Sequence, residues 1–298
     1  KSMKSKKTTL KTKNNFVYAV FVAPAVLLSI LFIFVPLLIG LYYSCRDWNG
    51  ISISSNFVGI RNYVNALSDK GFLGTIGFTL KFAFVMVTGY NVLGLTLAML
   101  LNMNLKLKGI LRAVYFMPIV IGTATVGYLW NFIIGSFLPF LGRTFGIGMF
   151  EKNWLAYPST AFLSLVIVSL WQGTGYYMII YLAGLQGVPT DLLEAAEIDG
   201  AGFRDRFTKI ILPLIRPSIT ICLFLSIVNS LKAFDLNYAL TGGGPYGTTK
   251  TIAYQIFLDA FNADQLSYAS AKAVIFSVVI GIVAIIQVKT TRRKEVEM

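Results

Sequence analysis

Long apolar stretches without charge recur along the chain and predict helices that cross a membrane. A helix needs about 20 apolar residues to span the hydrocarbon core of a bilayer. Four stretches of that order are Phe16–Cys45, Phe82–Leu105, Ala113–Gly142 and Asn153–Thr190. Two shorter ones are Pro217–Leu231, which can extend to about Asn237, and Ala273–Val288. The pattern therefore predicts an all-α, polytopic membrane protein with about six transmembrane helices.

The same pattern divides the chain into a membrane domain and two short tails. Residues 1–15 form a basic N-terminal tail, residues 16–288 the transmembrane domain and residues 289–298 a C-terminal tail. A basic start followed by an apolar run resembles a signal peptide. However, Phe16–Tyr43 has 28 residues without charge, which is too long for a signal h-region, and it lacks a clear A-x-A cleavage site. We expect this segment to remain as the first span.

The distribution of positive charge predicts the orientation in the membrane. With six spans, most of the 26 Lys and Arg residues fall on the side that holds both termini. Loops rich in Lys and Arg stay in the cytoplasm. Both termini, and the loop of residues 189–213 between the fourth and fifth spans, are therefore expected to be cytoplasmic.

Composition agrees with a membrane protein and argues against nucleic acid as a partner. Hydrophobic residues make up 56% of the chain and charged residues 13%, whereas soluble domains carry about 25% charged residues. A net charge of +13 is compatible with nucleic-acid binding. The cations, however, lie between the apolar runs and do not form one basic surface, so we expect a lipid bilayer and no nucleic acid.

The residue types needed for common catalytic sites are missing from the sequence. The chain has no histidine and two cysteines, Cys45 and Cys222, which lie in different apolar segments. We therefore expect neither a zinc site nor a disulfide bond. The motifs H-E-x-x-H and G-x-S-x-G and paired intramembrane carboxylates are also absent from the sequence. A membrane enzyme is thus disfavoured, and we expect no cofactor.

The loop of residues 189–213 carries a helix–turn–helix pattern. Asp191 and Glu194 have the spacing of a capping box at the start of a short helix, and Gly200 is a suitable helix stop. A second short helix is expected from about Phe203 to just before Pro213. Without further information, a surface helix with nothing docked on it would explain this segment.

The spacing within this loop resembles the EAA loop of ABC importer permeases. The matching positions are Glu194, Ala195, Ala196, Gly200, Ile210, Leu212 and Pro213. In that family the first helix of the loop docks on a separate ATPase subunit and transmits its closure to the spans. The resemblance therefore implies a type I ABC importer permease fold with ATPase coupling through these seven residues. Arg204 is added because, with Glu194, it can make charge-assisted contacts.

A second resemblance, from about Trp171 to Phe261, narrows the expected cargo. The segments F-D-L-N-Y-A-L-T-G-G-G-P and T-T-K-T-I-A-Y-Q-I-F-L-D-A-F look like those of permeases for oligosaccharides, including maltose-type subunits, and for glycerol-phosphate. The glycine-rich part does not match a P-loop, because Lys250 follows the two threonines instead of preceding them. We expect a turn that re-enters or caps the fifth span.

A sugar pathway needs hydroxyl, amide and aromatic groups on helix faces that look into the bundle. In span five, Ser226 and Ser230 lie on one helical face that Ala233 and Asn237 continue. Resemblance to maltose-type permeases implies that spans four and five line the site. The candidate pathway residues are Trp171, Gly173, Tyr176, Tyr177, Ser226, Asn229, Ser230 and Ala233. Each has an alternative role in helix packing or at the membrane interface.

Two classes of transporter remain to be separated at this level. An ion-coupled secondary transporter usually needs acidic groups at membrane depth, and Asp235, near an outer end, is the single candidate. The ABC resemblance instead implies a non-enzymatic subunit in a bacterial or archaeal cytoplasmic membrane, in which ATP is bound by a partner. The expected partners are a second permease, two ATPase subunits, an extracytoplasmic solute-binding protein and a sugar, with glycerol-phosphate or a polyol as alternatives.

Overall fold

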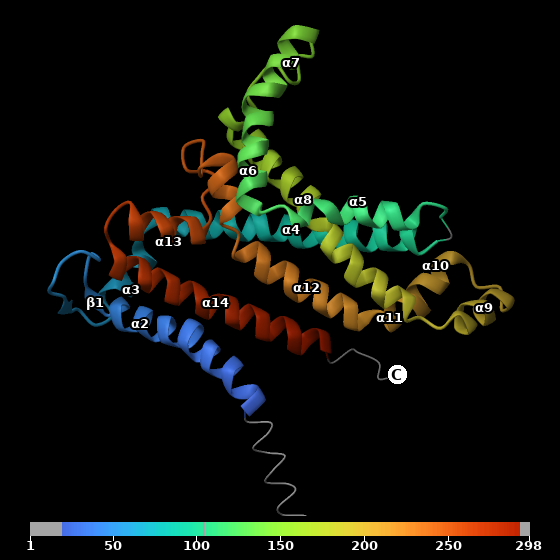
Figure 1. Cartoon of the computed structure of the whole chain (residues 1–298), viewed down its shortest axis with the longest axis horizontal. Helices are drawn as coiled ribbons and strands as arrows, with labels where there is room; N and C mark the ends of the chain where they lie inside the picture. The colour runs from blue at the N-terminus through green and yellow to red at the C-terminus, as the bar shows by residue number, and fades with distance from the viewer. Residues whose placement is uncertain (1–19, 104, 293–298) are drawn as a thin grey trace, which may run out of the picture. The chain divides into compact units, whose positions relative to one another are not determined.

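The computed structural model describes residues 20–103 and 105–292 and is helical almost throughout (Figure 1). The predicted tail of residues 1–15 and most of the predicted tail of residues 289–298 lie outside the described residues. Within them, the strands are β1 (Arg46–Asp47) and β2 (Asn56–Phe57), which pair antiparallel. The predicted all-α class is confirmed.

The helices of the first part of the chain begin with the apolar helix Val20–Ser44, which includes a π-helical segment. Labels with η denote π- or 3₁₀-helical segments. In chain order these elements are η1 (Ile30–Phe34), α2 (Val35–Ser44), α3 (Arg61–Ser68), α4 (Lys70–Asn102), α5 (Lys108–Val120), α6 (Thr123–Phe132), η2 (Ile133–Phe137), α7 (Leu138–Phe145), η3 (Trp154–Ala156) and α8 (Pro158–Gln186).

The helices of the second part include a run of short segments before the long C-terminal helices. They are α9 (Thr190–Ile198), α10 (Phe203–Asp205), η4 (Arg206–Ile211), α11 (Leu212–Leu214), α12 (Arg216–Leu231), η5 (Asn237–Thr241), α13 (Ile252–Phe261) and α14 (Leu266–Arg292). Because α14 continues to Arg292, the first residues of the predicted C-terminal tail are helical.

Five described helices are long and apolar enough to cross a membrane, and a bent pair supplies a sixth candidate. The five are Val20–Ser44, Lys70–Asn102, Thr123–Phe145, Pro158–Gln186 and Leu266–Thr291. The bent pair joins Phe203–Leu214 to Arg216–Leu231 at an angle of 71°. This number agrees with the predicted spans, although several boundaries differ.

The third predicted span, Ala113–Gly142, is not one helix. Its chain leaves the helix at Ile121 (φ −77°, ψ 131°) and re-enters it at Thr123. A break inside a membrane protein is stable where side chains satisfy the freed backbone groups. Here Gln172 of α8 donates its side-chain amide to the Ile121 carbonyl at 3.1 Å. A charge-free run of residues could not reveal this break, because its partner lies 51 positions away.

The second span begins well before the predicted Phe82. Helix α4 starts at Lys70, where the Asp69 carboxylate accepts from the backbone N–H groups of Gly71 and Phe72 at 2.8 and 3.2 Å. Such an N-cap satisfies two of the donors that a helix start leaves free. Lys81 therefore lies inside the helix, with its ammonium group 4.6 Å from the centre of the Phe162 ring. Charge alone did not mark the end of this helix.

The described chain falls into two compact units. One consists of residues 20–66 together with Asp259–Val274, and the other of Leu67–Leu258 with residues 275–292. In the first unit, the Asn62 amide donates to the carbonyls of Ser44 and Arg46 at 2.9 and 2.7 Å. In the same unit, Lys272 forms a buried ion pair with Asp259 at 2.7 Å.

The second unit is organised around α4, α8 and α12, which pack against one another, with α5 against α8 (Figure 1). Small residues allow the closest approaches, as is usual between membrane helices. At Gly175 of α8, an added Cβ would overlap the Tyr115 carbonyl of α5. Two buried apolar clusters form in this unit, one around Met178 and Tyr181 and the other around Met86 and Leu165.

The loop of residues 189–213 forms helices, but with different ends from those predicted. Pro189 occupies the N-cap position of α9, so Asp191 lies in the first turn and is not the predicted cap. Gly200 has φ +81° and ends the helix, as predicted. The second helix does not stop before Pro213. The π-helical segment η4 ends at Ile211, and Pro213 is the second residue of α11, in the first turn, where a missing N–H costs little.

Candidate functional site

The second unit contains a cavity of about 350 Å³ between α4, α8 and the segment that follows α12. Its size falls in the range of small-molecule sites, roughly 300–1,000 Å³. The lining residues are Phe82, Met86, Tyr90, Ile119, Thr123, Ser169, Gln172, Gly173, Tyr176, Tyr177, Asn229, Ser230, Lys232, Ala233, Phe234, Asp235, Leu236 and Asn237. They come from both apolar clusters and from both sides of the break between α5 and α6.

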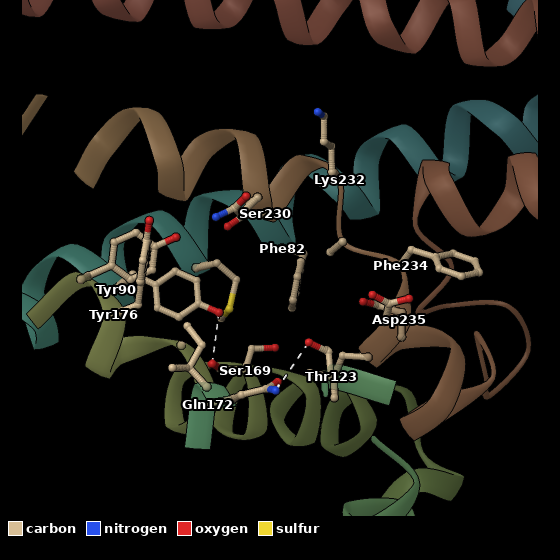
Figure 2. Close-up of a pocket in the computed structure, with 18 residues that line it drawn as sticks. Phe82, Tyr90, Thr123, Ser169, Gln172, Tyr176, Ser230, Lys232, Phe234 and Asp235 are labelled. Carbon is tan, nitrogen blue, oxygen red and sulfur yellow. Dashed lines mark hydrogen bonds between the residues drawn. The ribbon is translucent and has the colours of Figure 1, made fainter. Parts of the chain in front are cut away.

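One end of the cavity is aromatic. The Tyr90 and Tyr177 rings stack with centroids 4.7 Å apart, and Tyr176 meets Tyr177 edge-on at 5.5 Å. The Tyr90 hydroxyl donates to the Ser169 carbonyl at 3.1 Å, which fixes the ring (Figure 2). Gly173 leaves the space that this ring fills, because an added Cβ would lie 2.7 Å from a Tyr90 ring carbon. The result is a rigid aromatic surface in a largely apolar bundle.

The rest of the wall carries neutral polar groups and one charged residue of each sign. Figure 2 shows Ser169, Gln172 and Thr123 along one side, with Ser230 opposite. The spacing of Lys232 and Asp235, i and i+3, would allow an ion pair. In Figure 2 their side chains point in different directions. The opposite charges leave the lining with no net formal charge.

A buried polar network lies directly beside the cavity. Asn91 of α4 donates its amide to the Ser226 hydroxyl of α12 at 3.0 Å and to the Val87 carbonyl at 2.7 Å. The Tyr181 hydroxyl of α8 donates to the Asn91 side-chain oxygen at 2.5 Å. Every polar atom of the Asn91 amide group thus has a partner. The network ties three helices together, and a satisfied buried network of this kind rigidifies a core.

The structure brings most of the predicted pathway residues together. Gly173, Tyr176, Tyr177, Asn229, Ser230 and Ala233 line the cavity. Ser226 is not among the lining residues, and its hydroxyl instead accepts from the Asn91 amide at 3.0 Å. Trp171 is 43% exposed and packs edge-on against Trp130, with centroids 5.6 Å apart. Its place is on the outside of α8.

Sequence reasoning missed the contribution of α4 to the cavity. Phe82, Met86 and Tyr90 line it from that helix, and Asn91 is the centre of the adjacent network. The adjacent polar side chains Tyr90 and Asn91 in the middle of the predicted span were a usable signal, because polar groups inside spans are expensive and usually functional.

The loop of residues 189–213, here called the coupling loop, differs from the cavity in that most of its side chains are exposed. Glu194, Ala195, Gly200 and Arg204 are exposed, and Ala196, Ile210, Leu212 and Pro213 are half-buried. Exposed apolar residues accompany them, since Ile198 is 87% and Phe203 66% exposed. Leu193 of the same helix as Ile198 packs inward, against the apolar cluster around Met178.

Ion pairs stabilise the shape of this loop. Arg206 and Glu197 join α9 to the following segment, and Lys209 and Asp205 pair at 2.8 Å at i, i+4 spacing. The Phe203 and Phe207 rings stack with centroids 6.2 Å apart. The loop thus holds its conformation while presenting Ile198 and Phe203 outward. Exposed apolar side chains on a loop of defined conformation are suited to a contact with another protein.

The glycine-rich segment after η5 folds back onto that element, as a turn capping the fifth span should. The Thr241 and Thr249 hydroxyls are 2.8 Å apart, and the Asn237 amide donates to the Thr249 carbonyl at 3.1 Å. Gly242, Gly243 and Gly247 all have positive φ. These conformations are available to glycine at no steric cost.

A bundle of apolar helices, a cavity with mixed polar and apolar walls and an exposed helical loop together are typical of a multi-pass membrane transport subunit. The family model described as "Binding-protein-dependent transport system inner membrane component" matches residues 90–295. The chain belongs to this family, so the resemblance found in the sequence is confirmed. It is a transport permease, and its predicted role as a non-enzymatic subunit agrees with that membership.

Relatives and a solved structure cover nearly the whole chain. The probable starch degradation products transport system permease protein AmyD of Thermoanaerobacterium thermosulfurigenes is 40% identical over 286 residues, 96% of this chain and 97% of that protein. The multiple sugar-binding transport system permease protein MsmF of Streptococcus mutans is 35% identical over 97% of this chain and 100% of its own length.

The fold is shared with a bacterial ABC transporter involved in the import of the acidic polysaccharide alginate. One chain of that structure matches with a TM-score of 0.83 at 20% identity, covering 96% of this chain and 99% of its own. At this identity the match supports the fold alone, and it agrees with the predicted ABC importer permease fold.

Proposed function

We propose that this chain is the membrane permease of an ATP-driven importer whose cargo is a neutral sugar, most simply an oligosaccharide. The cavity of the second unit is the observation that carries this proposal. An aromatic surface can pack against the C–H face of a sugar ring, and the amides and hydroxyls opposite can bind its hydroxyl groups. The sugar-related names of the 40% and 35% identical relatives support the same cargo class.

The charge of the lining favours a sugar over glycerol-phosphate. An anionic phosphate is best bound by cationic groups that are not already balanced by acids. Here Lys232 shares the cavity wall with Asp235. A polyol remains chemically compatible with the polar wall, but it offers no ring to pack on Tyr90 and Tyr176. The cavity therefore fits a ring-shaped neutral cargo better than either alternative.

The coupling loop is the surface we assign to an ATPase partner. One ion pair, Arg206–Glu197, joins helix α9 to η4. Helix α9 presents Ile198, and Phe203 follows at the start of α10. Two ATPase subunits would bind the ATP, and one of them would bind this loop. A second permease and an extracytoplasmic binding protein would complete the importer in a bacterial or archaeal cytoplasmic membrane, with both termini of this chain in the cytoplasm.

The connection between loop and cavity suggests how the motor acts on the cargo. The segment Phe203–Leu214 leads through the bend at Ile215 directly into α12, which carries Ser230. The Asn91 amide ties α12 to α4 at Ser226. Movement of the loop would therefore displace helices that line the cavity, and ATP binding would bias the two openings of an alternating-access cycle.

Uptake by the reconstituted complex tests this function. The chain would be purified with its genomic partner permease and ATPase subunits, and proteoliposomes would be supplied with the binding protein, ATP and labelled maltotriose or glycerol 3-phosphate. We expect ATP-dependent maltotriose uptake that Tyr176→Ala abolishes. Tyr128→Ala, the same change at an exposed position of α6 outside the cavity, is the matched control.

Three results would contradict the proposal. Preferential uptake of glycerol 3-phosphate would refute the cargo class. Uptake driven by an ion gradient without ATPase subunits would indicate a secondary transporter. Equal loss of uptake in Tyr176→Ala and Tyr128→Ala would show that the cavity has no specific role in cargo transport.

A further inference from the structure

Asn237 is a lining residue of the cavity whose side chain is only half used by the fold. It is the first residue of η5 and is 0% exposed. Its Nδ2 donates to the Thr249 carbonyl at 3.1 Å. Because only the amide nitrogen can donate to a carbonyl, this contact fixes the orientation of the group. Its Oδ1 is buried and has no hydrogen-bond partner within residues 20–103 and 105–292.

The glycine-rich loop holds Asn237 through a closed set of contacts. The Thr249 hydroxyl donates to the Gly244 carbonyl at 2.6 Å and lies 2.8 Å from the Thr241 hydroxyl. Thr241 in turn donates to the Asn237 backbone carbonyl at 3.0 Å. Thr249 is itself 0% exposed. The loop therefore contacts both the side chain and the backbone of Asn237, and the contacting residue Thr249 is buried.

A second lining residue also has a buried polar atom without a hydrogen-bond partner. Ser230 of α12 is 3% exposed, and its Oγ is buried without a partner in the part of the chain that the structure describes. A buried polar group without a hydrogen bond is destabilising, so such groups usually meet a ligand or an ordered water. Two of them in the wall of one cavity point to a shared ligand.

We propose that Asn237 Oδ1 accepts a hydrogen bond from one hydroxyl group of the cargo, and that the loop of residues 241–249 is the element that positions it. This inference rests on the proposed sugar-import function and adds to it a specificity-determining residue. Ser230 supplies a second polar contact from the adjoining helix. Thr249 acts through Asn237 and is a positioning residue.

The fixed orientation has a consequence for the cargo. One N–H of Nδ2 is used by Thr249, and the atom without a partner, Oδ1, can only accept a hydrogen bond. A hydroxyl donor satisfies it, whereas an anionic oxygen meets a repulsive acceptor and a deoxy position leaves it unpaired. A site built to bind a hydroxyl discriminates strongly against the analogue that lacks it. The arrangement thus selects neutral cargo with a hydroxyl at one defined position.

The test compares maltotriose with its monodeoxy derivatives in the complete reconstituted importer, with saturating binding protein so that its own affinity does not set the rate. We expect wild type to discriminate against one derivative above the others. Asn237→Leu, which removes both polar groups at similar volume, should lower the maximal uptake rate of maltotriose by roughly fivefold to tenfold, the loss expected for one buried hydrogen bond. It should leave the rate for that one derivative unchanged.

The loop is tested without altering Asn237. Thr249→Val keeps the side-chain volume and removes the hydroxyl contacts, so the preference for maltotriose over the derivative should fall at least about twofold if one weak hydrogen bond is loosened. Thr248→Val is the matched control, because Thr248 is exposed and its hydroxyl bonds only within the loop turn, to Pro245. It should retain the wild-type preference.

The outcomes separate this inference from the proposed function. If wild type takes up none of the sugars, the proposed function fails and the inference fails with it. If wild type transports maltotriose but Asn237→Leu slows every derivative equally, Asn237 is structural only. If Asn237→Leu does not insert, an unchanged preference in Thr249→Val overturns the inference by itself.

Discussion

The cavity and the coupling loop belong to the same unit of the chain but place their apolar side chains in opposite ways. Around the cavity, Met86 and Tyr177 are almost completely buried, and neighbouring helices hold their rings and chains in one arrangement. In the loop, Ile198 and Phe203 project outward, while ion pairs and one inward-facing residue, Leu193, maintain the shape.

This difference indicates which site is complete within the chain. The walls of the cavity are formed by the chain's own helices. The groups there that lack a partner among the described residues are polar atoms, which a small polar ligand can bind. The exposed groups of the loop are apolar side chains, and removal of apolar surface from water is what drives most protein association. The two regions therefore call for different partners, a small polar molecule in one case and another protein in the other.

The largest effect is expected from making the loop polar. The double variant Ile198→Ser and Phe203→Ser should weaken association with the ATPase subunit at least about thirtyfold, because truncation of buried interface anchors commonly costs about 2 kcal/mol or more. Thermal stability of the chain itself should change little, since both side chains are mostly exposed and the change removes only the stacking of Phe203 on Phe207. Co-purification with a tagged ATPase subunit and thermal unfolding measure the two quantities.

Leu193→Ser is the control for that experiment. Leu193 lies in the same helix but packs on the apolar cluster, so its substitution should lower the unfolding temperature. Undiminished co-purification of the Ile198 and Phe203 variant would show that the exposed residues of the loop do not form the ATPase contact.

A smaller effect, confined to the cavity, is expected from Gly173→Ala. The added Cβ would lie 2.7 Å from the Tyr90 ring, and overpacking of this kind costs about 1–3 kcal/mol. Sugar uptake should fall about tenfold through displacement of the aromatic surface, whereas ATPase association should be retained. Uptake and co-purification in the same preparation measure this.

Gly74→Ala provides a matched control, because the space around Gly74 in α4 is open. A second change, Tyr90→Leu, should restore the thermal stability of Gly173→Ala without restoring uptake. Normal uptake by Gly173→Ala would mean that the position of Tyr90 is irrelevant to the cargo.

The smallest effect concerns the backbone of the loop. Gly200 has φ +81°, and a side chain in this conformation costs about 1 kcal/mol. Gly200→Ala should therefore weaken ATPase association by roughly fivefold through a distorted end of α9. Gly202→Ala, at φ −68° and with open space around it, should behave like wild type. Titration of the ATPase subunit against both variants would resolve the difference, and identical curves would argue against a role for the turn.

Sequence reasoning located the coupling loop better than it located the cavity, for a physical reason. The loop is a local element whose spacing, from Glu194 to Pro213, follows from one short stretch of chain. Even there the predicted ends of its helices were wrong, since the helical segments η4 and α11 continue past Pro213 to Leu214. The cavity is assembled from four separated segments, and the two that contain Tyr90 and Thr123 were not identified.

The apolar pattern, the charge distribution and the loop spacing by themselves determined the membrane class, the number of candidate spans and the family. These properties depend on local composition, because a bilayer demands long apolar helices whatever their neighbours are. Only the tertiary structure decided that Gln172 stabilises a break at Ile121, that Ser226 belongs to the Asn91 network, and that Asn237 is oriented by Thr249. Each of these depends on a partner from another part of the chain, and apolar periodicity contains no information on which polar groups will meet.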